Sequence, residues 1–285
     1  MPDNSITLFK KYVPMLDEVY KYAALTNVLD GPNELVREGA NAGELVVPDM
    51  TTQGLAGYSR STGFTDGTVT LVNTTYQCNY ERGRMFAVDT LDNAETAGVA
   101  FGRLAGEFIR IHVGPEIDAF RIAKYAGTTG IGGTAADLAT GADVVAALRV
   151  AATAMDNAEV PLTERYLFIV PNLYAMVEDM DTTKSRAVLS RFQQIIQVPQ
   201  TRMYSGVSLS TTGAGGYSKT STAKNLNFLV VHKGAVIQYN KHIVPKVVTP
   251  EQNQNADAWK FGYRVNGIAD VFKNKKAGIY AHTAA

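Results

Sequence analysis

The segment from Gly213 to Thr220 comes closest to a known chemical motif. Its residues match the phosphate-binding pattern G-x-x-x-x-G-K-[ST], except that Ser218 stands where the second glycine is required. A phosphate loop needs that glycine because backbone N–H groups surround the phosphates, and it needs a helix to follow. Here the strand-like run 227–231 follows instead. The sequence favours a surface loop. A degenerate phosphate loop at 213–220, in an α/β nucleotide-binding enzyme, remains the alternative from another class.

The other residues that could carry chemistry are scattered. The four histidines lack His-x-x-x-His spacing, and the single cysteine, Cys78, cannot build a zinc site. Residues 57–61 lack the last glycine of a serine-nucleophile elbow. Acidic groups at Glu116/Asp118 and Glu178/Asp179/Asp181 have contexts typical of solvated or ion-paired carboxylates. We therefore expect no enzyme, and no catalytic residue, cofactor or metal.

Charge and composition restrict the class of protein further. The 285 residues carry 27 basic and 27 acidic side chains, so the formal net charge is zero. A dedicated nucleic-acid binder usually has a basic excess, whereas a protein that only encloses nucleic acid needs none. One cysteine and no secretory signal suit a reducing cytoplasm. No apolar run is long enough to span a bilayer.

The first half of the chain predicts elements that cannot cover their own apolar side chains. Residues 1–42 mix short apolar pieces with proline and glycine, which indicates an arm that packs on something else. Residues 43–88 predict two long strands around a polar tip, with a bulge or a twist near Val72-Asn73 where the apolar alternation slips. Such a ribbon needs a partner surface. Residues 92–113 predict a long helix, capped by Asp92 with Glu95 and broken at Gly114-Pro115.

The second half predicts a compact α/β unit, because helical and strand-like stretches alternate between 128 and 243. Thr140 and Asp143 are expected to cap a helix. The apolar stripe of that helix consists of Val144, Leu148, Ala151 and Met155. Residues 166–170 form a fully apolar strand, and 189–198 are expected to form another helix. Residues 244–285 are strand-like again.

Between residues 54 and 127 the order of short motifs becomes specific. The motifs are Tyr58-Ser59-Arg60, Gly63-Phe64, Arg82-Gly83-Arg84-Met85-Phe86, Asp92-Asn93-Ala94-Glu95 and Pro115-Glu116-Ile117-Asp118. Their order and spacing resemble the tailed-bacteriophage major capsid family, which has the Hong Kong 97 (HK97-like) fold. Later pieces such as Glu159-Val160-Pro161 extend the resemblance over most of the chain. The resemblance implies an α+β subunit that self-assembles into the icosahedral head shell around the phage genome, in the virion.

The resemblance also implies a place for each region of the chain. Residues 1–42 correspond to the N-terminal arm, 43–88 to the extended loop that lies across a neighbour, and 89–127 to the spine helix and peripheral domain. Residues 128–243 correspond to the axial domain and 244–285 to the return strands of the peripheral domain. The implied partners are other copies of the chain, a separate scaffolding protein, a portal protein and a cement protein. Double-stranded DNA would be enclosed without sequence-specific binding, no membrane would be involved, and assembly would occur in the host bacterial cytoplasm. An encapsulin-type cargo shell, which shares the fold, is the nearest alternative.

Seven residues are predicted to make contacts between subunits. The arginines are expected to pair with acids of adjacent subunits, because weak exposed pairs of ~0.2–1 kcal/mol are repeated many times in a shell. The seven are Arg60, Phe64, Arg82, Arg84, Glu116, Asp118 and Asp257.

Overall fold

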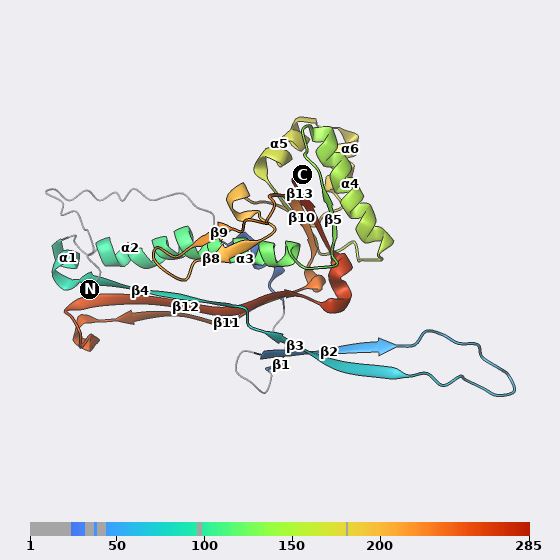
Figure 1. Cartoon of the computed structure of the whole chain (residues 1–285), viewed down its shortest axis with the longest axis horizontal. Helices are drawn as coiled ribbons and strands as arrows, with labels where there is room; N and C mark the ends of the chain where they lie inside the picture. The colour runs from blue at the N-terminus through green and yellow to red at the C-terminus, as the bar shows by residue number, and fades with distance from the viewer. Residues whose placement is uncertain (1–23, 32–36, 39–43, 96–98, 181) are drawn as a thin grey trace.

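A computed structural model describes residues 24–31, 37–38, 44–95, 99–180 and 182–285. Most of the arm expected at 1–42 lies outside these described residues. Its described part is a short 3-10 helix, η1 (Leu25–Leu29), and strand β1 (Arg37–Glu38). Figure 1 shows a rounded α/β unit from which a long three-stranded sheet and a hairpin extend in opposite directions.

The α/β unit is built on a five-stranded sheet in the order β5-β13-β10-β6-β7. The strands are β5 (Gly132–Ala135), β6 (Arg165–Ile169), β7 (Gln194–Gln197), β10 (Leu226–His232) and β13 (Ile279–Thr283). Helices α4 (Gly141–Asn157), α5 (Pro171–Met180) and α6 (Thr183–Leu189) pack on one face. Helix α3 (Gly114–Ala126) packs on the other. Every residue of β6 is buried, as expected for an apolar strand covered on both faces.

Helix α4 confirms the predicted cap and apolar stripe. The Thr140 hydroxyl accepts a hydrogen bond from the Asp143 N–H at 3.3 Å, and the Asp143 carboxylate accepts one from the Thr140 N–H at 3.0 Å. All four residues of the predicted stripe are buried.

The helix predicted at 189–198 is wrong. Helix α6 ends at Leu189, and residues 194–197 form β7, which pairs parallel with β6. The β-branched Ile195 and Ile196 suit an extended backbone. The segment forms a strand and not a helix because β6 offers a free edge with which it can pair. The residues of the segment itself do not reveal that edge.

The long sheet is antiparallel, in the order β11-β12-β4, with β11 (Val236–Val248), β12 (Ala258–Val271) and β4 (Tyr80–Asp89). It corrects the domain boundary predicted between residues 243 and 244, because β11 crosses that position without a break. The last strand, β13, lies in the sheet of the α/β unit, where its apolar residues 279–281 are buried. Of the strands predicted at 244–285, the end of β11 and all of β12 therefore belong to the long sheet, and β13 belongs to the sheet of the α/β unit.

The described part of the region predicted to be the spine helix contains α1 (Thr90–Glu95), α2 (Val99–Phe108), a π-helical turn (Ile109–Val113) and α3. The predicted break at Gly114-Pro115 is wrong, because Gly114 has helical dihedral angles (φ −57°, ψ −54°) and α3 begins there. The Gly114 N–H donates to the Ile109 carbonyl five residues earlier. This wider turn makes room for the ring of Pro115, which lacks an N–H of its own.

The hairpin consists of β2 (Glu44–Thr52) and β3 (Val69–Gln77) around a tip at 53–68. The two strands pair in continuous register, so the bulge, one of the two alternatives predicted near Val72-Asn73, is wrong. The slip in the apolar pattern has another cause, since Leu71 and Val72 are 65% and 54% exposed on opposite faces of the ribbon. Both faces of the hairpin carry apolar side chains that the subunit leaves uncovered.

Candidate functional site

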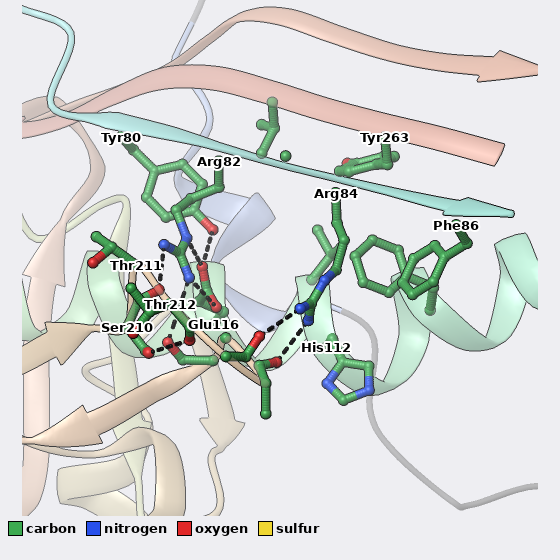
Figure 2. A pocket seen from close by; sticks show the side chains of 18 residues that line it. Tyr80, Arg82, Arg84, Phe86, His112, Glu116, Ser210, Thr211, Thr212 and Tyr263 are labelled. Atoms are coloured by element: carbon green, nitrogen blue, oxygen red, sulfur yellow. Dashed lines mark hydrogen bonds and ion pairs between the residues drawn. The ribbon is translucent and has the colours of Figure 1, made fainter. Parts of the chain in front are cut away.

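Three of the seven predicted residues converge on a cavity of about 420 Å³ beside the spine helix (Figure 2). Arg82 and Arg84 are two residues apart on β4, so both side chains lie on the same face of the long sheet. Glu116 lies in the first turn of α3. The loop 210–216, between the short strands β8 (Val207–Leu209) and β9 (Tyr217–Lys219), closes the cavity. The site thus joins three segments that are far apart in the sequence.

Arg82 and Glu116 form an ion pair within one chain. Arg82 Nε donates to Glu116 Oε1 at 2.7 Å, and Arg82 Nη2 donates to Oε2 at 3.3 Å, the paired geometry that suits a guanidinium and a carboxylate. The Tyr80 hydroxyl donates to the same Oε1 at 3.1 Å. The hydrogen bond that Arg82 donates to Glu116 raises the pKa of Arg82, and burial, followed by the charge of Glu116, raises the pKa of Tyr80. Arg82 therefore stays charged and Tyr80 stays protonated at physiological pH.

The glycine-rich loop is fastened to both arginines through its carbonyl groups. Arg84 Nη1 donates to the Ala214 carbonyl at 2.7 Å, and Arg84 Nη2 donates to the Gly213 carbonyl at 2.6 Å. Arg82 Nη1 donates to the Ser210 carbonyl at 2.7 Å. The loop turns its carbonyls toward β4 because three of its glycines adopt positive φ, a conformation that only glycine enters easily. These are Gly213, Gly215 and Gly216, with φ of 60°, 74° and 82°.

This geometry is the reverse of a phosphate loop. A phosphate site presents N–H groups to an anion at the start of a helix, whereas here carbonyl oxygens face cations. Residues 217–219 form a strand, and Lys219 Nζ donates to Asn225 Oδ1 at 2.7 Å. The surface-loop interpretation of 213–220 fits these observations, and the degenerate phosphate loop does not.

Asp118 is the centre of a second, fully buried cluster. Its carboxylate accepts hydrogen bonds from the N–H groups of Leu25 and Thr26 at 2.9 and 3.0 Å, and from the Thr26 hydroxyl at 2.8 Å. Arg202 Nη1 donates to it at 2.8 Å. The prediction that Asp118 pairs with an adjacent subunit is wrong, because its exposed fraction is 0% and its partners lie in the same chain.

The partners of Asp118 were missed by sequence reasoning. Arg202 is 84 residues away and Thr26 is 92 residues away. Arg121, one turn further along α3, also donates to Thr26, at 3.1 Å. No local pattern marks Thr26 or Arg202, because only the folded chain brings η1 and the 3-10 turn η4 (Gln200–Arg202) against α3.

The other predicted residues lie at the two far ends of the subunit. Asp257 accepts a hydrogen bond from the Thr90 hydroxyl at 2.8 Å, at the remote end of the long sheet. Arg60 and Phe64 lie at the hairpin tip, where Phe64 is 88% exposed and packs edge-on against Tyr58 at 4.9 Å between ring centroids. The structure does not bring Arg60, Phe64 or Asp257 to the cavity, and their contacts with other subunits stay a prediction.

The arrangement around Arg82 and Arg84 fastens one part of the subunit to another. A guanidinium stays protonated at any useful pH, so neither arginine can act as an acid or base. Within the described ranges, no group of three or more His, Cys, Asp or Glu side chains could hold a metal ion. None of the described helices combines the length and the apolar character needed to cross a membrane.

The sequence matches no protein-family model and no curated protein. Solved structures nevertheless match the fold over nearly the whole chain. The mature capsid of bacteriophage PhiM1 gives a TM-score of 0.67 at 11% sequence identity, over 99% of this chain and 93% of that chain. The capsid of the cyanophage P-SCSP1u gives 0.62 at 16% identity, over 98% and 93%. The chain has the fold of a phage capsid protein.

The phage capsid fold confirms the predicted α+β architecture of the Hong Kong 97 type. The virus-like particle from Pyrococcus furiosus matches less well, with a TM-score of 0.56 at 12% identity over 87% of this chain and 90% of that chain. The assignments of the hairpin to the extended loop, of α1–α3 to the spine helix and of the α/β unit to the axial domain stay predictions. The cavity around Arg82 and Arg84 lies between the long sheet, the start of α3 and the loop 210–216.

Proposed function

We propose that this chain is the major capsid protein of a tailed bacteriophage. Copies of the chain would assemble into the icosahedral head shell that encloses the phage genome. The observation that carries the proposal is a capsid fold with a long projecting hairpin that the subunit does not cover. The capsid fold also favours a structural role over an enzymatic one.

The hairpin supports assembly on physical grounds. Seven of the fourteen large hydrophobic side chains that are exposed in the described chain lie in residues 44–77. A free two-stranded ribbon is marginal in water, and a concentration of exposed apolar side chains marks an interaction surface. The long sheet also has exposed apolar side chains, with Met85 on one face and Ile243 and Val247 on the other. A hairpin of one copy that covers the sheet of the next makes a heterologous contact, which generates rings.

The alternatives fit less well. An encapsulin-type cargo shell would use the same fold, and no feature of the described residues favours it over a phage head. The genes beside this one would separate the two, since a portal and a terminase accompany a phage capsid and a cargo enzyme accompanies an encapsulin. A nucleotide-binding enzyme would need a phosphate site, and the loop 213–220 faces its carbonyls toward arginines.

The proposal extends to partners and location. A separate scaffolding protein, a portal protein and a cement protein would act with the shell in the host bacterial cytoplasm, and the finished protein would reside in the virion head. Zero net charge suits a wall that encloses double-stranded DNA without reading its sequence.

Assembly of the full chain tests this proposal directly. The chain is expressed alone and with the candidate scaffold, and the products are followed by sedimentation and electron microscopy. Closed shells or capsomers are expected. A chain that stays monomeric at high concentration, with and without the scaffold, would refute the proposal.

A further inference from the structure

Three of the described strands are at least nine residues long and form the border of a sheet: β3, β4 and β11. A border strand presents a row of backbone N–H and C=O groups that its own sheet does not use, and proteins protect such rows with charged side chains or proline. β4 carries Arg82, Arg84 and two acids, and β11 contains Pro245 and Lys246. These two borders are therefore protected against pairing with another chain.

The border formed by β3 has no such protection. Its sequence, Val-Thr-Leu-Val-Asn-Thr-Thr-Tyr-Gln, contains no charged residue and no proline, and its β-branched residues favour an extended backbone. One edge of β3 pairs with β2, and no other described strand pairs with the second edge. Figure 1 shows that the hairpin projects away from the α/β unit, and residues 69–73 are all exposed. The second edge of β3, here called the open edge, is available to another chain.

We propose that the open edge of β3 pairs antiparallel with the open edge of β3 in a second copy of this chain. The two hairpins would then form one continuous sheet across a two-fold axis. A strand without charged side chains can lie against its own copy, because like charges directly opposite each other destabilise a sheet. The inference rests on the proposed function, since it joins copies within a shell.

A contact of this kind supplies what the contact within a ring lacks. A heterologous contact between a hairpin and the long sheet of the next copy generates rings, but it does not join one ring to another. A two-fold contact is isologous, because both copies use the same surface. The faces of the hairpin and the open edge of β3 are separate surfaces, so one hairpin can make both contacts. The faces would build the ring, and the edge would join two rings.

The two-fold axis also predicts the register of the pairing. Directly opposite residues of an antiparallel pair point to the same face, so the axis places one residue of β3 opposite its own counterpart. Tyr76 is buried against the body of the subunit, which leaves residues 69–75 for the pairing. Val72 is the midpoint of this stretch. Val72 should therefore face its own counterpart, and Thr70 should face Thr74 of the second copy.

Single cysteines test the pairing in assembled particles of the full-length chain. Cys78→Ser removes the native thiol, and one cysteine is then placed at each position of 69–75 in turn. Directly opposite Cα atoms lie about 4.5–5.5 Å apart, which a disulfide can bridge, whereas residues beside the central one are too far from their own counterparts. After oxidation, denaturing electrophoresis without reductant should show one maximum of disulfide-linked dimer, at Val72→Cys.

Two of these variants test the register when they are combined. Thr70→Cys alone and Thr74→Cys alone should give little dimer, because neither residue faces its own counterpart. Particles assembled from both variants together should give dimers in which position 70 is joined to position 74. Thr51→Cys is the matched control, because Thr51 is exposed on β2 and pairs with Thr70 within the hairpin. It should not form a dimer.

A charge test gives an independent readout. The variant T70K/T74K places like charges opposite each other across the two-fold axis, so closed shells should be lost while rings persist. The variant T70K/T74E places opposite charges there and should restore the shells. Electron microscopy distinguishes rings from shells. Normal shells from T70K/T74K, or no recovery with T70K/T74E, would contradict the pairing.

The outcomes separate this inference from the proposed function. Well-formed particles without a dimer maximum within 69–75 would overturn the edge pairing and leave the shell function standing. A dimer from Thr51→Cys as abundant as that from Val72→Cys would indicate random collision and would overturn the pairing in the same way. A wild-type chain that forms no particles would remove the shell function, and the edge pairing that rests on it would fall as well.

Discussion

The α/β unit and the hairpin contain similar apolar residues, but the α/β unit buries them and the hairpin exposes them. In the α/β unit, Phe168 and Leu229 lie in strands that are covered on both faces and have no exposed surface. In the hairpin, Leu71 and Val72 point to solvent from opposite faces of one ribbon. The α/β unit therefore covers its apolar residues within one chain, whereas under the proposed function another chain would cover those of the hairpin. Changes in the first should alter subunit stability, and changes in the second should alter assembly.

The largest effect on stability is expected from Phe168→Ala in the centre of the five-stranded sheet. Removing this buried ring leaves a cavity and should lower the free energy of unfolding by about 4 kcal/mol. Urea unfolding of the unassembled subunit, followed by circular dichroism, measures the loss. Phe64→Ala at the exposed hairpin tip removes the same ring and should change stability by less than about 0.5 kcal/mol. Similar losses in the two variants would erase the contrast between the regions.

Arg82→Glu should have the next largest effect. It places a carboxylate against Glu116, which is 8% exposed, and breaking a pair of this kind costs about 3 kcal/mol. If Arg82 paired with an acid of an adjacent subunit, as the sequence predicts, this variant would impair assembly more than folding. The ion pair within the chain now predicts a folding defect. The double variant R82E/E116R restores opposite charges and should recover more than half of the lost stability. Wild-type stability in Arg82→Glu alone would show that the pair contributes nothing.

The difference between these two predictions shows what the sequence could reveal. Phe168 lies in an apolar strand between turn signals, so its burial was predictable from adjacent residues. The pattern of Arg82 and Arg84 on a strand was also visible. Their partners were not, because Glu116 is 34 residues away and the loop carbonyls are about 130 residues away.

The errors in the predicted elements have the same origin. The helix predicted at 189–198 is β7 because β6 offers it an edge, and Pro115 continues the spine helix because a π-helical turn precedes it. The capping box of Thr140 and Asp143 needs only residues within one turn, and it was predicted correctly. The elements that depend on contacts between neighbouring residues could be predicted from the sequence. The elements that depend on contacts between distant residues could not.

Arg84→Ala should have a smaller effect on stability, about 1 kcal/mol. Arg84 fastens the loop 210–216 through two hydrogen bonds to carbonyls at an exposed position, and such bonds contribute modestly. The loop should lose these two hydrogen bonds, while the five-stranded sheet that contains β6 stays intact. Hydrogen exchange should therefore accelerate in 210–216 and remain unchanged in β6. Arg149→Ala, an exposed change on α4, is the control, and exchange that it accelerates equally would argue against the fastening.

The pH dependence of stability should also reside in the α/β unit. Burial lowers the pKa of His282, whose ring stacks on Phe228 at 4.9 Å between centroids. The unfolded chain therefore takes up a proton more readily than the folded chain below about pH 6.5. The free energy of unfolding should be constant above that pH and fall as the pH decreases below it. Burial shifts the pKa of His232 in the same direction. His282→Gln should flatten the curve, and an unchanged slope would exclude His282 as a source.

The smallest effect on stability is expected from the double change L71S/V72S in the hairpin. Both side chains are exposed, so the free energy of unfolding of the subunit should change by less than about 0.5 kcal/mol. Assembly should nevertheless fail, because a shell repeats the lost apolar contact at every subunit. Sedimentation and electron microscopy measure assembly, and urea unfolding measures stability on the same preparation. Thr70→Ser, a polar change at an exposed position of the same strand, is the control.

The contribution of each face of the ribbon to assembly can be tested separately. Leu71 lies opposite Met50 in the register, and Val69 lies two residues away on the same face, whereas Val72 points to the other face. If a neighbour covers only one face, Leu71→Ser and Val72→Ser should differ sharply in particle yield. If the hairpin is held between two surfaces, each single change should reduce the yield and the double change should abolish it. Normal particles from the double variant would mean that the apolar side chains of the hairpin are not an interface. The contrast with the α/β unit would then have no bearing on assembly.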